Sequence, residues 1–145
     1  MTSHVALPVD KAILLVEDDP DDAELTIRAL RRVGIRGPII TARTAAKAMA
    51  LLRHPPADLG HDGTLLSLVL LDLNLPGPGG LGVLDAIRSD PQAAQVPIVV
   101  VTGSTSPRDR ERCDENGALG ILEKPVDPGA LLQLLGDANV TRAAA

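Results

Sequence analysis

The chain has 145 residues, of which 45% are hydrophobic and 23% are charged, a balance that is typical of one soluble globular domain. A formal net charge of −5 and the absence of Phe, Trp and Tyr argue against a nucleic-acid partner, which needs basic surface and aromatic platforms. Residues 1–10 lack the apolar core of a signal peptide, and no run approaches the roughly 20 apolar residues of a membrane span, so we expect a cytoplasmic protein without membrane contact.

The first half of the chain predicts two strands and two helices. Residues 12–16 are a short apolar run that suits a buried strand, and residues 17–22, which include five acids, follow it directly. An Asp-Pro start and a closing Gly predict a helix over residues 19–34. Residues 38–41 predict a strand near a sheet edge because it begins with Pro, and a Thr cap predicts a helix over residues 44–53.

The middle of the chain predicts a polar loop, a central strand and a helix. Residues 54–64 contain two His and two Asp, but their spacing matches no standard metal-ligand pattern and indicates an ordinary loop. Residues 65–71 are predicted to form the central strand, because the apolar run that begins at Leu68 is typical of a strand buried on both faces, and Asp72 follows at its carboxyl end. Residues 81–89 predict a helix that stops before an Asp-Pro pair.

The last third predicts two more strands, each followed by a helix that begins with a capping residue and Pro. The strands are residues 96–101 and 118–123, and the helices are residues 106–116 and 127–137. Cys113, the one cysteine, is expected to fill a small buried apolar position. The inner face of the final helix is predicted to consist of Leu131, Leu132, Leu134 and Leu135.

Five strands that alternate with five helices predict an α/β domain with a parallel sheet covered on both faces and right-handed crossovers. We expect this domain to occupy residues 11–137, with residues 1–10 as an N-terminal tail and residues 138–145 as a C-terminal tail. With these bounds, we expect no DNA-binding domain within these 145 residues.

Polar residues follow the apolar runs where the first, third, fourth and fifth predicted strands end, at the edge where ligands gather in such sheets. Three carboxylates would repel one another unless a cation intervened, and oxygen ligands with room for water suit Mg²⁺. A carboxylate, a metal ion, an ammonium and a hydroxyl together suit transfer of a phosphoryl group to Asp72. The strand-end residues are Glu17, Asp18, Asp72, Thr102 and Lys124, with the backbone of Asn74 close behind.

Four motifs resemble the receiver domain of two-component response regulators. They are Val-Glu-Asp-Asp-Pro at 16–20, Leu-Leu-Asp-Leu-Asn-Leu-Pro at 70–76, Val-Val-Val-Thr-Gly-Ser at 99–104 and Leu-Glu-Lys-Pro at 122–125. Each is weak alone, but together and in this order they are specific. The residues of these motifs further resemble those of the stand-alone regulators that partner bacterial phytochrome kinases. The resemblance implies a flavodoxin-like (βα)5 doubly wound sheet with strand order 2-1-3-4-5.

The resemblance also implies a role for each strand-end residue. Asp72 would accept a phosphoryl group from the histidine of a sensor histidine kinase, which could be a bacteriophytochrome, and the output would be a protein contact or a phosphorelay. The implied site has Asp18 and Asp72 as carboxylate ligands of Mg²⁺, Glu17 as a ligand through water, Asn74 as a main-chain ligand, and Lys124 and Thr102 as partners of the phosphoryl oxygens. Lys124-Pro125 would be a cis peptide.

One position departs from the family pattern. The family commonly has Tyr or Phe three residues before the lysine, where this chain has Ile121. A switch in which an aromatic ring turns inward is therefore impossible here, and movement of Thr102 and its loop would have to carry the signal.

Two other functions stay open from the sequence. A phosphatase with an Asp nucleophile needs a second carboxylate two residues on, where this chain has Asn74. A degenerate receiver that only docks partners would not need the complete set of acids with Thr102 and Lys124. Homodimerisation through the fourth and fifth helices is a further expectation from the resemblance.

Overall fold

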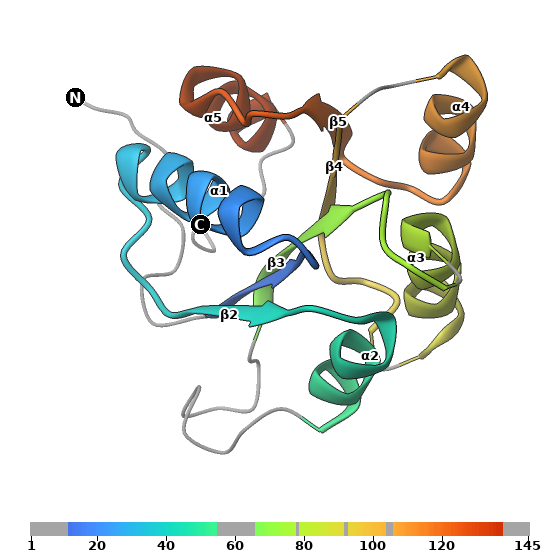
Figure 1. Ribbon diagram of the computed structural model, residues 1–145. Helices are drawn as coiled ribbons and strands as arrows, with labels where there is room; N and C mark the ends of the chain where they lie inside the picture. Colours follow the sequence, from blue (N-terminus) through green and yellow to red (C-terminus); the bar gives the residue numbers. More distant parts are fainter. Residues whose placement is uncertain (1–11, 55–65, 78, 92, 104–105, 138–145) are drawn as a thin grey trace.

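The computed structural model describes residues 12–54, 66–77, 79–91, 93–103 and 106–137. Within them, five parallel strands form one sheet in the order β2-β1-β3-β4-β5, and one helix follows each strand (Figure 1). The predicted fold class and strand order are therefore confirmed. The elements are β1 (Ala12–Val16), α1 (Pro20–Arg32), β2 (Ile39–Ala42), α2 (Ala45–Arg53), β3 (Leu66–Asp72), α3 (Gly79–Ser89), β4 (Ile98–Thr102), α4 (Pro107–Glu115), β5 (Gly120–Glu123) and α5 (Pro128–Asp137).

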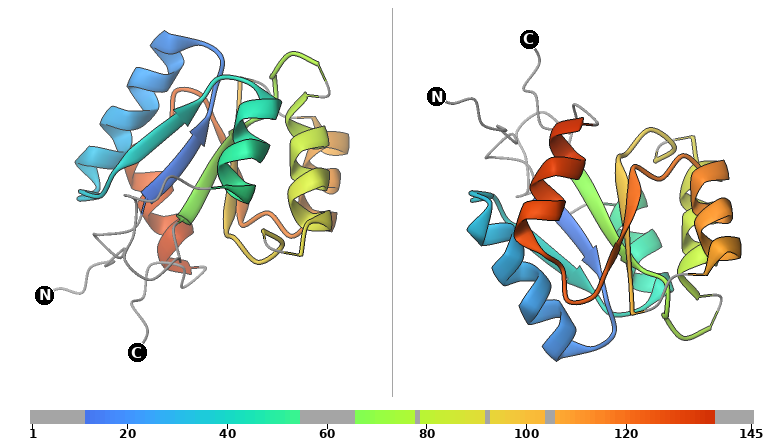
Figure 2. Two further views of the ribbon diagram at one scale, coloured as in Figure 1. Left: turned by 90° about the horizontal axis from the view of Figure 1, so that it is seen from below. Right: turned by 90° about the horizontal axis from the view of Figure 1, so that it is seen from above.

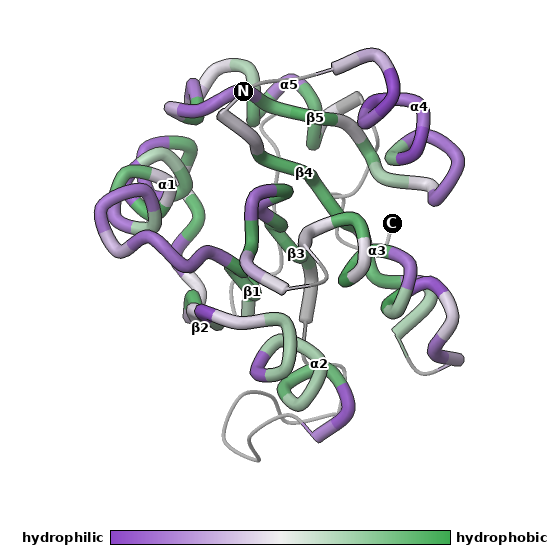
Figure 3. Tube along the Cα trace, turned by 45° about the vertical axis from the view of Figure 1, so that its right-hand side comes forward, coloured by the Kyte–Doolittle hydropathy of each residue, from purple (hydrophilic) through white to green (hydrophobic). Residues whose placement is uncertain are grey.

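Helices cover both faces of the sheet and create two hydrophobic cores. The helices α1 and α5 lie on one face, and α2, α3 and α4 lie on the other (Figure 2). Side chains alternate along each strand, so Ile13 and Leu15 of β1 enter the core under α1 and α5, whereas Leu14 and Val16 enter the other. This two-sided burial explains why the strands are mostly apolar, while the helices mix hydrophilic and hydrophobic residues (Figure 3).

Capping side chains begin four of the helices where the sequence predicts them, including α5, where Asp127 Oδ2 accepts a hydrogen bond of 2.8 Å from the N–H of Ala130. Asp19 Oδ1 accepts hydrogen bonds from the N–H groups of Asp21 and Asp22 at 2.8 and 3.3 Å, and Pro20 occupies the first helical position of α1. Thr44 caps α2 and Ser106 caps α4 in the same way. Cys113 on α4 is fully buried, as expected.

Several predicted strand boundaries are shifted. The strands predicted at 38–41 and 65–71 lie one residue further along the chain, so Asp72 is the last residue of β3 and pairs with Val101. The strands predicted at 96–101 and 118–123 begin two residues later, because turn hydrogen bonds from Val96 to Ala93 and from Ala118 to Cys113 hold the preceding residues.

Two predictions for the helices are wrong in detail. Helix α3 begins at Gly79, two residues before the predicted start, because the N–H of Gly80 donates to the carbonyl of Leu73 at 3.0 Å. On α5, Leu131 and Leu135 are buried but Leu132 is exposed, since it is turned about 100° from Leu131 around the helix axis.

Several predictions lie outside the described residues. They are the two tails and the body of the loop before β3. Among the described helices, none is both long and apolar enough to cross a membrane.

Gly80 lets the first turn of α3 lie directly on the end of β3. A Cβ atom at this position would lie 2.3 Å from the carbonyl oxygen of Asp72 and 2.5 Å from the Cα of Leu73. Since both are backbone atoms, no side-chain rotation can relieve the clash.

We therefore expect Gly80→Ala to lower the free energy of unfolding by about 1–3 kcal/mol, as overpacking does. Helix propensity alone predicts the opposite sign, since it favours Ala over Gly by about 1 kcal/mol inside a helix. Urea unfolding measures the difference. Gly103→Ala is the matched control at the same sheet edge, because its Cβ would meet only the Asn74 side chain, at 3.9 Å. A Gly80→Ala protein as stable as the Gly103→Ala protein would contradict this account.

Candidate metal and phosphoryl site

The carboxyl ends of four strands meet at one edge of the sheet, next to the point where the strand order reverses. Glu17 and Asp18 follow β1, Asp72 ends β3, Thr102 ends β4 and Lys124 follows β5. The parallel register brings these ends to one level, since Val16 pairs with Leu71 and Thr102 with Glu123. In open α/β sheets this crevice is where ligands bind.

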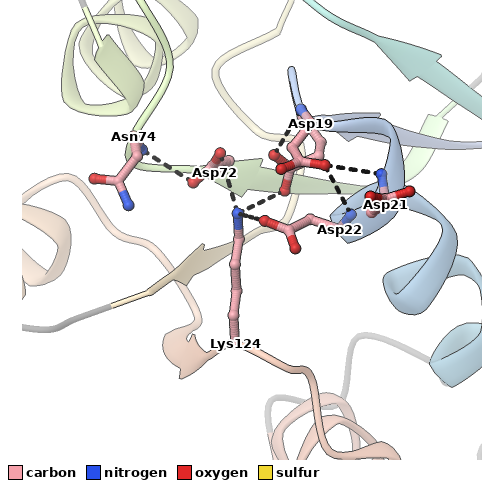
Figure 4. Close-up of polar contacts among 7 residues, drawn as sticks. Asp19, Asp21, Asp22, Asp72, Asn74 and Lys124 are labelled. Carbon is pink, nitrogen blue, oxygen red and sulfur yellow. Dashed lines mark hydrogen bonds and ion pairs between the residues drawn. The ribbon is translucent and has the colours of Figure 1, made fainter.

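Lys124 is the centre of the site. Its Nζ lies 2.8 Å from Glu17 Oε1, 2.9 Å from Asp22 Oδ2 and 3.3 Å from Asp72 Oδ2 (Figure 4). The side chains of Glu17 and Asp72 are only 2% and 3% exposed, and that of Lys124 is 15% exposed. The ammonium therefore has three carboxylate partners within ion-pair distance.

Three carboxylates form a cluster that could hold a cation. One oxygen each from Glu17, Asp18 and Asp72 lies within 4.8 Å of the others, and Asp18 is the least buried of the three. Backbone groups fix two of these side chains, because the N–H of Asn74 donates to Asp72 Oδ1 at 2.9 Å and the N–H of Asp19 donates to Glu17 Oε2 at 3.2 Å. The oxygen-only donor set, partly open to water, fits a hard divalent cation.

The electrostatics of the cluster favour added positive charge. Burial raises the pKa of the Glu17 carboxyl to about 7, and Asp72 adds to the rise, although Lys124 and the Asp19 N–H oppose it. Burial alone would lower the pKa of the Lys124 ammonium, but its hydrogen bonds to Glu17 and Asp22 outweigh burial and raise that pKa. One ammonium therefore does not fully compensate the surrounding acids.

The structure places Thr102 and Asn74 beside this cluster. Thr102 is 1% exposed, and its carbonyl accepts a hydrogen bond of 2.7 Å from the N–H of Lys124. Asn74 follows β3 and contacts Asp72 through its backbone N–H. The Lys124-Pro125 bond is cis, as the resemblance implies.

The sequence analysis missed one member of the site. Asp22 is not among the site residues expected from the sequence, and the structure shows that its carboxylate reaches Lys124 from the first turn of α1. The signal that could have found it is position: the first turn of a helix that directly follows a strand lies over the strand's carboxyl end.

Lys124 lies among acids at the carboxyl edge of a five-stranded parallel sheet, and comparisons with known proteins identify the family that has this fold. A family model described as the response regulator receiver domain matches residues 13–136. The chain therefore belongs to the response regulator receiver domain family.

The relatives include regulators from archaea and cyanobacteria. The chain is 38% identical over 117 residues to the probable methanogenesis regulatory protein FilR2 of Methanothrix harundinacea, which covers 79% of this chain and 72% of that protein. It is 37% identical over 94 residues to response regulator Rcp1 of Synechocystis sp., covering 65% of this chain and 63% of Rcp1. It spans only 23% of a probable cyclic di-GMP phosphodiesterase of Vibrio cholerae.

Solved structures of phytochrome-associated regulators are similar over nearly the whole chain. The bacteriophytochrome response regulator AtBRR is 32% identical with a TM-score of 0.78, and the match covers 93% of this chain and 96% of that one. The Mn²⁺-bound form of Rcp1 is 30% identical with a TM-score of 0.70, and the match covers 93% and 97% of the two chains.

The raised pKa of Glu17 gives a prediction for the metal-free protein. Its carboxyl is easier to keep protonated in the folded state than in the unfolded state, where the pKa is 4.5. The stability that protonation gives is complete below pH 4.5 and is lost as the pH rises through about 7. By linkage the loss is at most about 3 kcal/mol.

We expect Glu17→Gln to remove this loss, because the amide keeps a hydrogen-bond acceptor for Lys124 without titrating. Urea unfolding in EDTA at pH 5 and pH 8 should show a smaller fall in stability for the variant than for the wild type. Glu24→Gln, on the exposed side of α1, is the control and should follow the wild type. Parallel pH profiles for the wild type and Glu17→Gln would contradict the assignment.

Proposed function

We propose that this receiver domain accepts a phosphoryl group on Asp72 from the histidine of a sensor histidine kinase, in a reaction that depends on Mg²⁺. The observation that carries the proposal is the contact of Lys124 Nζ with Asp72 Oδ2 at 3.3 Å inside the carboxylate cluster. A carboxylate nucleophile with an ammonium at its side has both parts that phosphoryl transfer to an acid requires.

Each residue has a task in this transfer. A carboxylate oxygen of Asp72 attacks phosphorus while the phosphorus–nitrogen bond of the donor histidine breaks, and the imidazole keeps the electron pair and takes a proton from solvent. Asn74 holds the carboxylate through its N–H and so fixes its rotation. Lys124 compensates the charge on the phosphoryl oxygens, and the Thr102 hydroxyl donates a hydrogen bond to one of them.

The carboxylate cluster would hold the metal ion. Asp18 and Asp72 would bind Mg²⁺ directly, Glu17 would bind it through water, and the main-chain carbonyl of Asn74 would complete the protein ligands. When bound, the ion would supply positive charge that offsets the negative charge on the phosphoryl oxygens.

The output is proposed to be a protein contact or a phosphorelay, with no further catalysis. Asn74 stands where an Asp-nucleophile phosphatase would need a second carboxylate, and an amide cannot serve as a general acid.

Regulators of bacteriophytochromes are among the similar structures, so a kinase of that class is the proposed phosphodonor. Phosphotransfer from a panel of purified kinases tests this choice. Homodimerisation through α4 and α5 stays a prediction.

Phosphorylation of Asp72 is tested with a small phosphodonor. Incubation with acetyl phosphate and Mg²⁺ should add one phosphoryl group, which intact-protein mass spectrometry detects and mild base removes. Asp72→Asn should abolish the adduct, because an amide oxygen is a poor nucleophile. The control is Asp85→Asn, an exposed acid of α3 that pairs with Arg112 and should label like the wild type. Labelling that survives in Asp72→Asn would refute the assignment.

Metal binding is tested by thermal unfolding. At pH 8, Mg²⁺ at ten to a hundred times its dissociation constant should stabilise the protein by about 1–3 kcal/mol. At pH 6 the gain should be smaller, because Glu17, with its pKa near 7, is then mostly protonated and competes with the ion.

Asp18→Asn should lose the gain at both pH values. NaCl of equal ionic strength is the control for general screening. Equal stabilisation of the wild type and Asp18→Asn would place the ion elsewhere.

A further inference from the structure

Asp22 reaches the site from a helix, whereas the other acids come from strand ends. Its Oδ2 lies 2.9 Å from Lys124 Nζ, although the two residues are 102 positions apart in the sequence (Figure 4). The Asp22 side chain is 36% exposed, and the Asp19 cap fixes the helical turn that carries it. Asp22 therefore closes the solvent side of the ammonium.

Among the contacts of the described residues, Asp22 is the acceptor of Lys124 that lies outside the carboxylate cluster. Glu17 and Asp72 belong to the group whose oxygens lie within 4.8 Å of one another, together with Asp18, and Asp22 does not. A cation in the cluster would thus compensate the negative charges of Glu17 and Asp72, and Lys124 would remain the partner of Asp22.

The ammonium already contacts Glu17 and Asp22, as well as Asp72, when Asp72 carries no phosphoryl group. A phosphoryl oxygen on Asp72 that approaches Lys124 must therefore share the ammonium with Glu17 and Asp22 or displace one of them. Glu17 is buried and held by the N–H of Asp19, so it has little freedom to leave. Asp22 is half-open to water and can be solvated when it gives up its contact.

We propose that Asp22 is a positioning residue that holds Lys124 in the resting site and competes with the phosphoryl group for it. The inference rests on the proposed phosphorylation of Asp72 and deepens it. The negative charge of Asp22 lowers the affinity of the site for a phosphoryl group, and its removal leaves the full charge of Lys124 for the phosphoryl oxygens.

The test measures the dissociation constant of beryllofluoride, a phosphoryl mimic, in the presence of saturating Mg²⁺. Asp22→Asn should bind it roughly three to ten times more tightly than the wild type, the size expected for a partly exposed charge-assisted contact. Asp22→Glu restores a carboxylate and should return the dissociation constant to within about twofold of the wild type.

Asp21→Asn is the matched control. Asp21 stands in the same first turn of α1, so its loss has the same effect on the helix dipole, but its carboxylate does not contact Lys124 in the described contacts. A merely structural role for Asp22 predicts weaker binding in Asp22→Asn. Binding equal to or weaker than that of Asp21→Asn would overturn the proposal.

A second measurement needs neither metal nor phosphoryl mimic. In the metal-free protein, the Lys124 ammonium protons should exchange with water faster in Asp22→Ala than in the wild type, as followed by ¹⁵N NMR and assigned with Lys124→Arg. Unchanged exchange would overturn the proposal.

If wild-type Asp72 takes up phosphate while Asp22→Asn behaves like Asp21→Asn, only this inference fails. If wild-type Asp72 takes up none, the proposed function fails with it.

Discussion

The compensation of buried negative charge by Lys124 is the interaction on which the site depends. Glu17 and Asp72 are almost completely buried, and burial of an unpaired carboxylate strongly destabilises a fold. One ammonium contacts both of them and Asp22 as well, so acids still outnumber cations within the cluster. Burial raises the pKa of the Glu17 carboxyl to about 7, and the neighbouring Asp72 adds to the rise. A site with surplus negative charge is stabilised by a cation, and the metal and phosphoryl chemistry proposed here uses that property.

The parallel sheet brings these strand-end side chains together, although they are far apart in the sequence. Strands in register end at the same level, so a polar residue directly after each apolar run arrives at a common edge. The close approach of Gly80 to the backbone at Asp72 then brings the first turn of α3 onto the same edge. Backbone hydrogen bonds orient the side chains, since Asp72 and Glu17 each accept one from a nearby N–H.

This geometry explains what could be predicted from the sequence. The five strands, their order of appearance and the placement of Asp72 and Lys124 follow from short apolar runs that end in polar residues. Asp22 could not be assigned in this way, because its contact depends on how α1 is rotated against the sheet. The same holds for Arg88, which donates to backbone carbonyls of two loops at the opposite edge, including those of Asn116 and Val96 at 2.7 and 2.8 Å. No local pattern marks an arginine that ties two loops together.

The chain contains no Phe, Trp or Tyr. A structural change at Asp72 must therefore be transmitted to the surface by aliphatic and polar side chains. Ile121 on β5 is partly buried against the core under α3 and α4, and it cannot make the inward turn of a ring. The hydrogen bond from the N–H of Lys124 to the carbonyl of Thr102 joins the ends of β4 and β5, so a displacement of Lys124 acts on both. Its contact with Asp22 extends the same connection to the first turn of α1. A phosphoryl group that draws Lys124 away from Asp22 would therefore alter the charge that the first turn of α1 presents to solvent.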